Sequence, residues 1–185
     1  EDFERIAEVI FGAPSVVSRF EGTGRLTKAM ADELGLVGPA ARACGLDRAA
    51  RRDHPEGIYR SVSFPVVTRD TGDVMARAEV RRAEVGCSAA FVRAEVAALT
   101  DGPLTVALPP RLRPSTLAVA MSEGWRGEIV HLATTSADGR LASYKIVDPS
   151  FHNWFGLAMA LRDGQISDFP LCNKSFNLSY AGHDL

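Results

Sequence analysis

The side chains that could hold a metal ion are few in this sequence, and their spacing argues against a metal site. The cysteines are Cys44, Cys87 and Cys172, and the histidines are His54, His131, His152 and His183. No two cysteines form a CxxC pair, and no histidine has a second metal-binding side chain three or four residues further along. Neither a thiolate metal centre nor a disulfide framework is indicated, so we expect a reducing compartment.

Charged residues with helical spacing lie on the longest helical pattern of the chain. This pattern runs from Asp73, a predicted N-cap, to Leu99. At about 1.5 Å per residue, such a helix spans roughly 40 Å, enough to cross a domain. Arg81 and Glu84 lie three residues apart and can pair on one face of it. They are either a surface ion pair, which contributes little to stability, or part of a functional network.

Shorter elements are expected before that helix. Apolar spacing predicts a helix over 1–12, and Thr27 is a predicted N-cap for a helix over 28–34. Alternating apolar residues predict a strand over 58–67. The small, glycine-bracketed residues 38–45 predict a tight loop, because their spacing matches no phosphate-binding fingerprint.

Beyond the long helix the pattern changes to strands. A strand is expected at 104–108. A hairpin is expected from 125–135 and 140–147, because the Asp-Gly pair between them favours a tight turn. Asp148 is the predicted N-cap of a last helix over 151–162, with a proline in its first turn.

The final segment, 168–185, carries no helical apolar period and contains Pro170 and Gly182. Its apolar residues alternate with polar neighbours, and they are Phe169, Leu171, Phe176, Leu178 and Tyr180. This alternation predicts an extended segment with one buried face, of which an edge strand is the simplest form.

The composition is that of a soluble globular protein. The chain has 185 residues, of which 46% are hydrophobic and 24% charged, and its net charge is −2. So small a charge predicts no binding to nucleic acid or to an anionic membrane, and no apolar run reaches the roughly 18 to 20 residues of a membrane span. The acidic first residues predict no secretory signal. The order of elements predicts the α+β class, with a long central helix, shorter helices and a small antiparallel sheet.

Several short motifs occur in an order that resembles one protein family. They are Gly22-Thr-Gly24, Gly38-Pro-Ala-Ala-Arg42, Arg51-Arg-Asp-His-Pro55 with Tyr59, Gly72-Asp73 with Arg77, Arg81 and Glu84, Glu123-Gly-Trp-Arg-Gly-Glu128, Asp148-Pro-Ser-Phe-His-Asn-Trp154 and Ile166-Ser-Asp-Phe-Pro170. This order resembles the C-terminal half of the large subunit of group 4, energy-converting NiFe hydrogenases of the formate hydrogenlyase type. It is also similar to the related 49-kDa, quinone-site subunit of respiratory complex I. The resemblance covers nearly the whole chain. It implies a hydrogenase large-subunit-like fold, with residues 1–185 as the C-terminal portion of a longer chain.

The tail departs from the family pattern at two positions. Hydrogenases of this family hold nickel and iron with two CxxC pairs, the second of which lies in the C-terminal tail. Here Ser179 and Gly182 occupy the positions of those cysteines. A hydroxyl is a poor nickel ligand beside a thiolate, glycine has no side chain, and Cys172 lies too far from Gly182 to restore the pair. The resemblance therefore implies a metal-free relative rather than an active hydrogenase.

The resemblance also implies a function and partners. The chain would be a subunit of an oxidoreductase complex of the NADH:quinone oxidoreductase or hydrogenase type, peripheral to the inner membrane on its cytoplasmic side. The expected partners are an iron–sulfur subunit and other subunits of the complex, in which NAD binding would also lie. No cofactor is expected in this chain; quinone is a candidate ligand, for electron transfer or coupled ion translocation. The alternative is a structural subunit without redox chemistry that docks an iron–sulfur partner.

The candidate site residues come from the family motifs and from the tail. Those expected to form a charged network from the long helix to the tail are Arg77, Arg81, Glu84, Arg126 and Glu128. Those expected to carry protons are Tyr180, His183 and Asp184. A histidine titrates near neutral pH, and a neighbouring carboxylate can tune it. The alternative is that His183 and Asp184 are solvated end residues.

Overall fold

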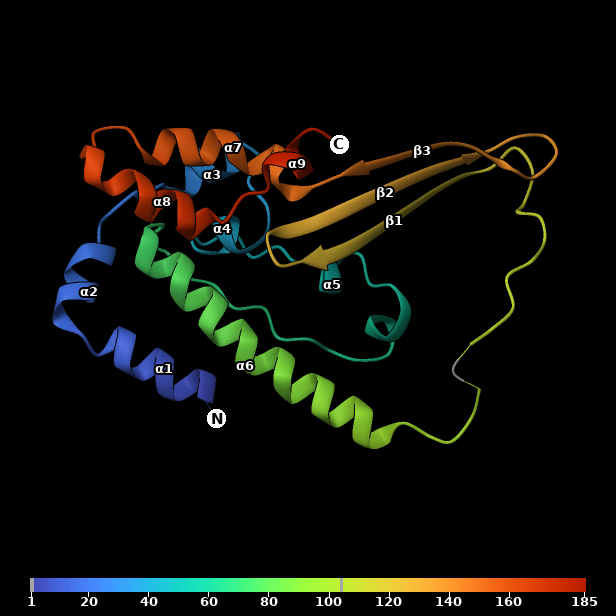
Figure 1. Ribbon diagram of the computed structural model, residues 1–185, viewed down its shortest axis with the longest axis horizontal. Helices are drawn as coiled ribbons and strands as arrows, with labels where there is room; N and C mark the ends of the chain where they lie inside the picture. The colour runs from blue at the N-terminus through green and yellow to red at the C-terminus, as the bar shows by residue number, and fades with distance from the viewer. Residues whose placement is uncertain (1, 104) are drawn as a thin grey trace.

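A long helix and a three-stranded sheet dominate the molecule (Figure 1). The computed structural model describes residues 2–103 and 105–185. Helix α6 (Val74–Ala98) runs along one side, and strands β1 (Leu117–Gly124), β2 (Gly127–Thr135) and β3 (Leu141–Val147) extend away from the helices. The sheet is antiparallel in the order β1-β2-β3. The predicted α+β class, with its long helix and small antiparallel sheet, is confirmed.

All the other described helices are shorter than α6. Before it come α1 (Asp2–Phe11), α2 (Pro14–Phe20), α3 (Lys28–Glu33), α4 (Gly38–Arg42), α5 (Ala50–Asp53) and the 3-10 helix η1 (Gly57–Arg60). After the sheet come α7 (Pro149–Ala160), the 3-10 helix η2 (Ile166–Asp168), α8 (Phe169–Phe176) and α9 (Tyr180–His183). Within the described residues, none of these helices has the length and apolar character needed to cross a membrane, nor does α6.

Side-chain caps fix where the predicted helices begin. Thr27 accepts a hydrogen bond from Met30 N at 3.2 Å, and Asp148 accepts one from Ser150 N at 2.8 Å. Asp73 accepts from Ala76 N at 2.8 Å, so α6 begins where its cap was expected. The helices expected around 1–12, 28–34, 73–99 and 151–162 are confirmed over the described residues.

The core lies between α3, α4, α7, α8 and only the first part of α6. Its buried residues are Leu26, Ala31, Leu36, Ala40, Ala41, Cys44, Leu46, Val74, Leu157, Ala160, Cys172 and Phe176. On α6 itself, the buried residues are Val74, Ala76, Arg77 and Val80. The remaining turns of α6, from Arg81 onward, are half-buried or exposed and lead away from the core (Figure 1).

The closed end of the β1–β2 hairpin is pressed against α4. Gly38 has a φ of +64°, and a Cβ built on it would lie 2.7 Å from the backbone nitrogen of Gly127. Glycine is therefore required at position 38 both for its backbone conformation and for the close approach of the hairpin. This contact sets the hairpin turn, Trp125 and Arg126, beside the helices.

Two predicted elements differ in the structure, and the sheet contains one strand that was not predicted. Residues 38–45 form the one-turn helix α4 followed by a turn, not a loop throughout, because a proline in the first turn favours a helix start. Residue 104 lies outside the described residues, and 105–108 form no strand. The sheet instead gains β1, whose Leu-Ala-Val-Ala-Met start has no polar alternation to reveal it.

The predicted strand over 58–67 is also wrong. Its aromatic residues contact α6 instead of a neighbouring strand: the Phe91 ring lies 5.6 Å from that of Tyr59 and 5.5 Å from that of Phe64, centroid to centroid. Tyr59 lies in the 3-10 helix η1 and Phe64 in the irregular segment after it, so the apolar pattern alone did not identify the element.

The tail is helical where an extended edge strand was expected. Helix α8 begins with a proline in its first turn, and its buried residues Cys172 and Phe176 lie four positions apart. It ends at Asn177, whose left-handed conformation (φ 57°) is typical of a helix C-cap. The segment does have one buried face, but its period is that of a helix.

Two glycine substitutions distinguish two costs to stability: the strain of a positive φ and the collision of a new methyl group with the hairpin. Gly38→Ala should lower the free energy of unfolding by about 3 kcal/mol or more, because the new methyl collides with the hairpin backbone. Gly35→Ala is the matched control: its φ is +65° and no atom lies within 4 Å, so only about 1 kcal/mol should be lost. Urea unfolding measures both, and equal losses would show that the hairpin does not press on Gly38.

Candidate functional site

Arg77 is a fully buried cation that joins three segments distant in the sequence. Its guanidinium donates to Gly72 O at 2.9 Å, Gly24 O at 3.0 Å and Ser175 Oγ at 2.9 Å. It also lies 4.5 Å above the centre of the Phe176 ring. Burial lowers the pKa of Arg77 to about 10, which still leaves it protonated at neutral pH.

Two further arginines bind the C-terminal end of α8. Arg81 donates to Ser175 O at 2.6 Å and to Phe176 O at 3.1 Å, and Arg126, on the hairpin turn, donates to Asn177 O. The last carbonyls of a helix have no partners within it and carry partial negative charge, so cations stabilise them. We call Arg77, Arg81 and Arg126 the arginine clamp, because together they hold the start of the tail.

A second charged group is buried beside the clamp. Arg42, 1% exposed, pairs with Glu84 (Nε to Oε1, 2.8 Å) and with Glu123 (Nη1 to Oε1, 2.9 Å). The second oxygen of Glu123 accepts from Ala50 N at 2.8 Å. Breaking one partner of such a group leaves an uncompensated buried charge, which typically costs about 3–5 kcal/mol. The motif residue Arg42 was not singled out as a site residue; its family motif was the only sequence signal for it.

The structure divides the five residues that were expected to form one charged network, and Glu128 joins neither group. Arg77, Arg81 and Arg126 reach the tail, whereas Glu84 pairs with Arg42 and not with Arg81. Among the described residues Glu128 forms no ion pair and no side-chain hydrogen bond. The helical spacing of Arg81 and Glu84 allowed an ion pair, but the unpaired carbonyls of α8 bind Arg81 instead.

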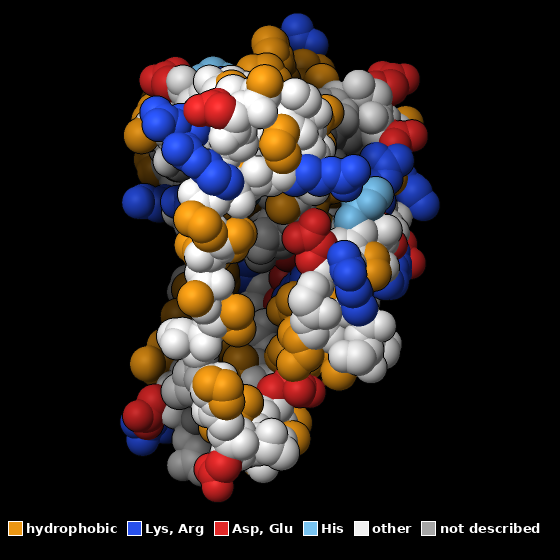
Figure 2. Space-filling model, turned by 90° about the vertical axis from the view of Figure 1, so that its right-hand side faces the viewer, with side chains coloured by type: hydrophobic (Ala, Val, Ile, Leu, Met, Phe, Trp, Pro, Cys, Tyr) orange, Lys and Arg blue, Asp and Glu red, His pale blue; other side chains and the backbone are white. Residues whose placement is uncertain are grey.

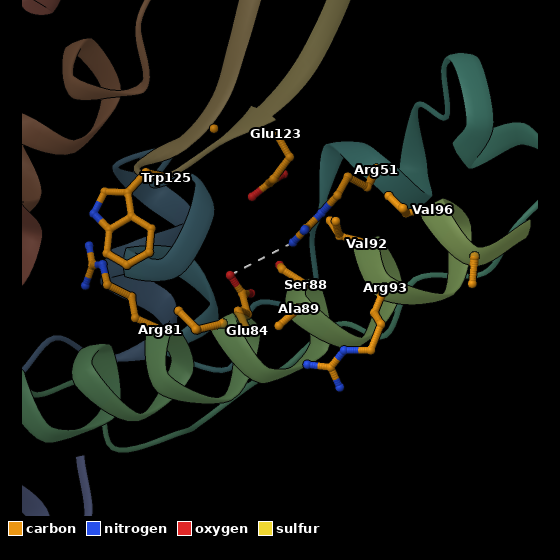
Figure 3. Close-up of a pocket in the computed structure, with 13 residues that line it drawn as sticks. Arg51, Arg81, Glu84, Ser88, Ala89, Val92, Arg93, Val96, Glu123 and Trp125 are labelled. Atoms are coloured by element: carbon orange, nitrogen blue, oxygen red, sulfur yellow. Dashed lines mark ion pairs between the residues drawn. The ribbon is translucent and has the colours of Figure 1, made fainter. Parts of the chain in front are cut away.

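The two charged groups meet at one end of an open groove of about 1,000 Å³ (Figure 3). One wall is the exposed part of α6, with Val85, Ala89, Val92 and Val96, and Trp125 lies on the other side over Arg81. Arg51 reaches into the groove toward Glu84, with 3.9 Å between Nη2 and Oε2. From the side where the sheet and α6 end, the molecule is deeply hollowed and hydrophobic side chains gather along the hollow (Figure 2). The groove thus offers an apolar wall and a charged end.

Protein contacts surround Ser179 and Gly182, the two positions where the resemblance to hydrogenases implies cysteines. Ser179 Oγ accepts from Gly182 N at 3.0 Å, and Ser179 N donates to Ser150 Oγ at 2.9 Å. A Cβ at Gly182 would lie 2.6 Å from the carboxyl carbon of Asp148. Within the described residues, no three His, Cys, Asp or Glu side chains are grouped as a metal site. The residues present do not fit a NiFe centre.

The tail residues form an aromatic cluster on α7 and α9. The His183 ring stacks on Phe151 (centroids 5.7 Å apart) and meets the edge of Trp154, which also contacts Tyr180 at 5.2 Å. Tyr180 and Asp184 are exposed, whereas His183 is half-buried. The structure therefore brings Tyr180 and His183 together and leaves Asp184 in solvent.

The buried cysteines are not poised for reaction. Burial raises the pKa of the Cys44 thiol to about 11 and also raises that of Cys172. Both lie near Arg77, which lowers each pKa but does not overcome burial. They remain neutral thiols at physiological pH.

The contribution of the clamp to stability can be measured at Arg81. Arg81→Ala should lower the free energy of unfolding by about 2–3 kcal/mol, because two carbonyls of α8 lose a charged donor. Arg93→Ala, an exposed arginine on the same helix, is the matched control and should change it by less than about 0.5 kcal/mol. If the two variants unfold at the same urea concentration, the clamp contributes nothing.

Comparison with known proteins places this geometry in one family. Residues 1–116, more than half of the chain, match the model of the respiratory-chain NADH dehydrogenase 49 Kd subunit. The carbon monoxide-induced hydrogenase of Rhodospirillum rubrum is 33% identical, with 89% of this chain and 45% of that protein covered. Formate hydrogenlyase subunit 5 of Escherichia coli is 29% identical, over 99% of this chain and 32% of that protein.

A solved structure shares the fold. The structure of the membrane-bound sulfane sulfur reductase (MBS), an archaeal respiratory membrane complex, has a chain that matches with a TM-score of 0.90 at 24% identity. The match covers 100% of this chain and 52% of that one. This chain spans less than half the length of the two curated relatives above. It belongs to the family of the respiratory-chain NADH dehydrogenase 49 Kd subunit, which the motifs of the sequence indicated.

Proposed function

We propose that this chain is a metal-free subunit of a membrane-associated oxidoreductase complex, packed on an iron–sulfur subunit. Its task would be electron transfer to quinone or coupled ion translocation. The names of its relatives support this: a hydrogenase, a formate hydrogenlyase component, and a component of the NADH-quinone oxidoreductase of Sinorhizobium medicae, which is 37% identical over 58% of this chain. In such a complex the chain would lie peripherally, on the cytoplasmic side of the inner membrane.

The observation that carries the metal-free part of the proposal is the contact between Gly182 and Asp148. A Cβ at position 182 would lie 2.6 Å from the carboxyl carbon of Asp148, so a cysteine there would require this carboxylate to move. Asp148 in turn caps α7. The space of the second thiolate is taken up by a residue that also holds the fold.

The groove is the candidate site for quinone. Its α6 wall is apolar enough for an isoprenoid chain, and its charged end, with Arg51 and Glu84, offers donors and acceptors for a polar head group. The chain's own residues would bind and orient the ligand there. The redox centre that exchanges electrons with it would belong to the iron–sulfur subunit.

A structural role without redox chemistry is the second candidate. Large apolar side chains are exposed on α6, α7 and α9, among them Val92 (57%), Val96 (66%), Phe155 (72%) and Tyr180 (67%). Val92 and Val96 lie one turn apart on α6, and an exposed apolar helix face of this kind is typical of a surface that packs on a partner. This observation supports docking whether or not quinone binds.

Metal analysis of the protein purified with its partners tests the proposal. We expect iron from the iron–sulfur subunit and no stoichiometric nickel, because the tail supplies no thiolate pair. Elemental analysis by mass spectrometry measures both metals. Stoichiometric nickel that disappears in Ser179→Ala would overturn the metal-free assignment.

Turnover of the assembled complex tests whether the tail transfers protons. If His183 and Asp184 carry protons, His183→Ala and Asp184→Asn should each lower quinone-linked turnover by about 100-fold or more, the lower end of the range that acid–base groups contribute. His54→Ala, an exposed histidine outside the tail, is the control. Unchanged turnover in both tail variants would favour the structural role.

A further inference from the structure

Arg51 is a largely buried cation whose hydrogen-bond donors are not used within the described part of the chain. It lies on α5, and its side chain is only 12% exposed. Its Nε atom is buried and has no hydrogen-bond partner. The carboxylate of Glu84 is 3.9 Å from Nη2, which is too far for a hydrogen bond. A buried cation with unused donors at the end of an open groove points to a ligand that accepts hydrogen bonds.

The carboxylates beside Arg51 are already bound by another arginine. Both oxygens of Glu84 contact Arg42, at 2.8 and 3.2 Å. Glu123 binds Arg42 with one oxygen and a backbone N–H with the other. Because Arg81 also lies at this end of the groove, three arginines stand against two glutamates there. One positive charge is in excess, which favours a ligand with a negatively charged oxygen.

An aromatic ring holds Arg51 in place. The guanidinium carbon lies 3.8 Å from the centre of the Phe64 ring, which is within the range of a cation–π contact. Phe64 is 6% exposed and packs edge-to-face with Tyr59 and Phe91, at centroid distances of 6.2 and 5.5 Å. A ring accepts the charge without using the N–H groups as a carboxylate would. The donors of Arg51 therefore stay available to the groove, into which the side chain points (Figure 3).

We propose that Arg51, positioned by Phe64, binds the head group of the quinone and selects a head that carries a negatively charged oxygen. The apolar wall of α6 takes the chain of the ligand, and the guanidinium donates to the oxygen in place of water. This inference rests on the proposed quinone site. It adds the residue that binds the head group, the residue that holds it there and the charge that the site prefers.

Two quinones with the same alkyl chain and different charge test the inference. One is an alkyl hydroxynaphthoquinone, whose hydroxyl is a vinylogous acid and is ionised at neutral pH. In the other, a methyl group replaces the hydroxyl, so the molecule is neutral. Their dissociation constants are measured by isothermal titration calorimetry on the protein purified with its partners, without an electron donor. We expect the anionic quinone to bind at least about tenfold more tightly, the scale of a charge-assisted hydrogen bond.

Substitutions of two arginines that line the same groove assign this preference to one side chain. Arg51→Gln should remove it, so that the two dissociation constants agree within about twofold. Arg51→Lys keeps the charge and should retain a preference of at least about threefold. Arg93→Gln is the matched control, because Arg93 lines the groove but is exposed, and it should leave the preference unchanged.

The positioning role of Phe64 is tested with the same two ligands. Phe64→Leu keeps an apolar side chain but removes the ring that holds the guanidinium, so the preference should fall by about threefold or more. Phe64→Tyr keeps the ring and should keep the preference. A purely structural role of Phe64 would weaken the binding of both quinones alike and leave their ratio unchanged, which would contradict the positioning role.

The outcomes separate this inference from the quinone site on which it rests. If both quinones bind and Arg51→Gln shows the same preference as the unaltered protein, or the unaltered protein shows none, the inference is wrong and the quinone site stands. If neither quinone binds, the quinone site is wrong and the inference falls with it. Nickel content tests the metal-free assignment independently of both.

Discussion

The contact on which the rest of the site depends is the binding of the C-terminal end of α8 by three arginines: Arg81 and Arg126 bind its backbone carbonyls, and Arg77 binds the Ser175 hydroxyl. Helix α8 ends in the protein interior, and a helix end without partners there would cost several unmade hydrogen bonds. Arg77 and Arg81 come from the buried start of α6, and Arg126 comes from the hairpin turn. Because the hairpin turn is itself fixed by the close approach of Gly38 and Gly127, one set of contacts joins the long helix, the sheet and the tail.

The tail that follows this clamp is held by protein contacts at each position where a hydrogenase would use a metal. Ser179 contributes a hydroxyl that caps α9 and a backbone N–H that binds Ser150. Gly182 lies against the carboxylate of Asp148. If the chain is metal-free, as we propose, a helix cap and a close backbone approach hold the tail where the resemblance to hydrogenases implies a metal.

The sequence predicted the elements whose signals are local. Asp73, Thr27 and Asp148 each began a helix as expected, and the Asp-Gly turn produced the hairpin between β2 and β3. The charged residues that reach the tail were expected from the family motifs, but their partners were not. Arg81 binds backbone carbonyls, which no spacing rule reveals, and Glu84 binds Arg42, which lies in a distant part of the chain.

The predictions that failed concern segments whose structure depends on packing against other parts of the chain. The apolar residues over 58–67 include Tyr59 and Phe64, which pack on α6 and not in a sheet, so a pattern resembling that of a strand appeared without one. In the tail, Pro170 was taken as a helix breaker although proline is favoured in a first turn, and the pair Cys172 and Phe176 defines the buried face. Strand β1 is largely exposed, so its residues carry little of the alternation that one-sided burial imposes.

Hydrogen exchange of the Gly182 and His183 amides tests the central claim most directly, since both amides bind Ser179 in the folded tail. The exchange would be measured in the protein purified with its partners, before and after treatment with a nickel chelator, and in Arg81→Ala. If the clamp and not a metal holds the tail, the chelator leaves exchange unchanged, while Arg81→Ala accelerates it at least about tenfold, equivalent to about 1.4 kcal/mol of local stability. Exchange that accelerates on chelation and is unaffected by Arg81→Ala would contradict the account.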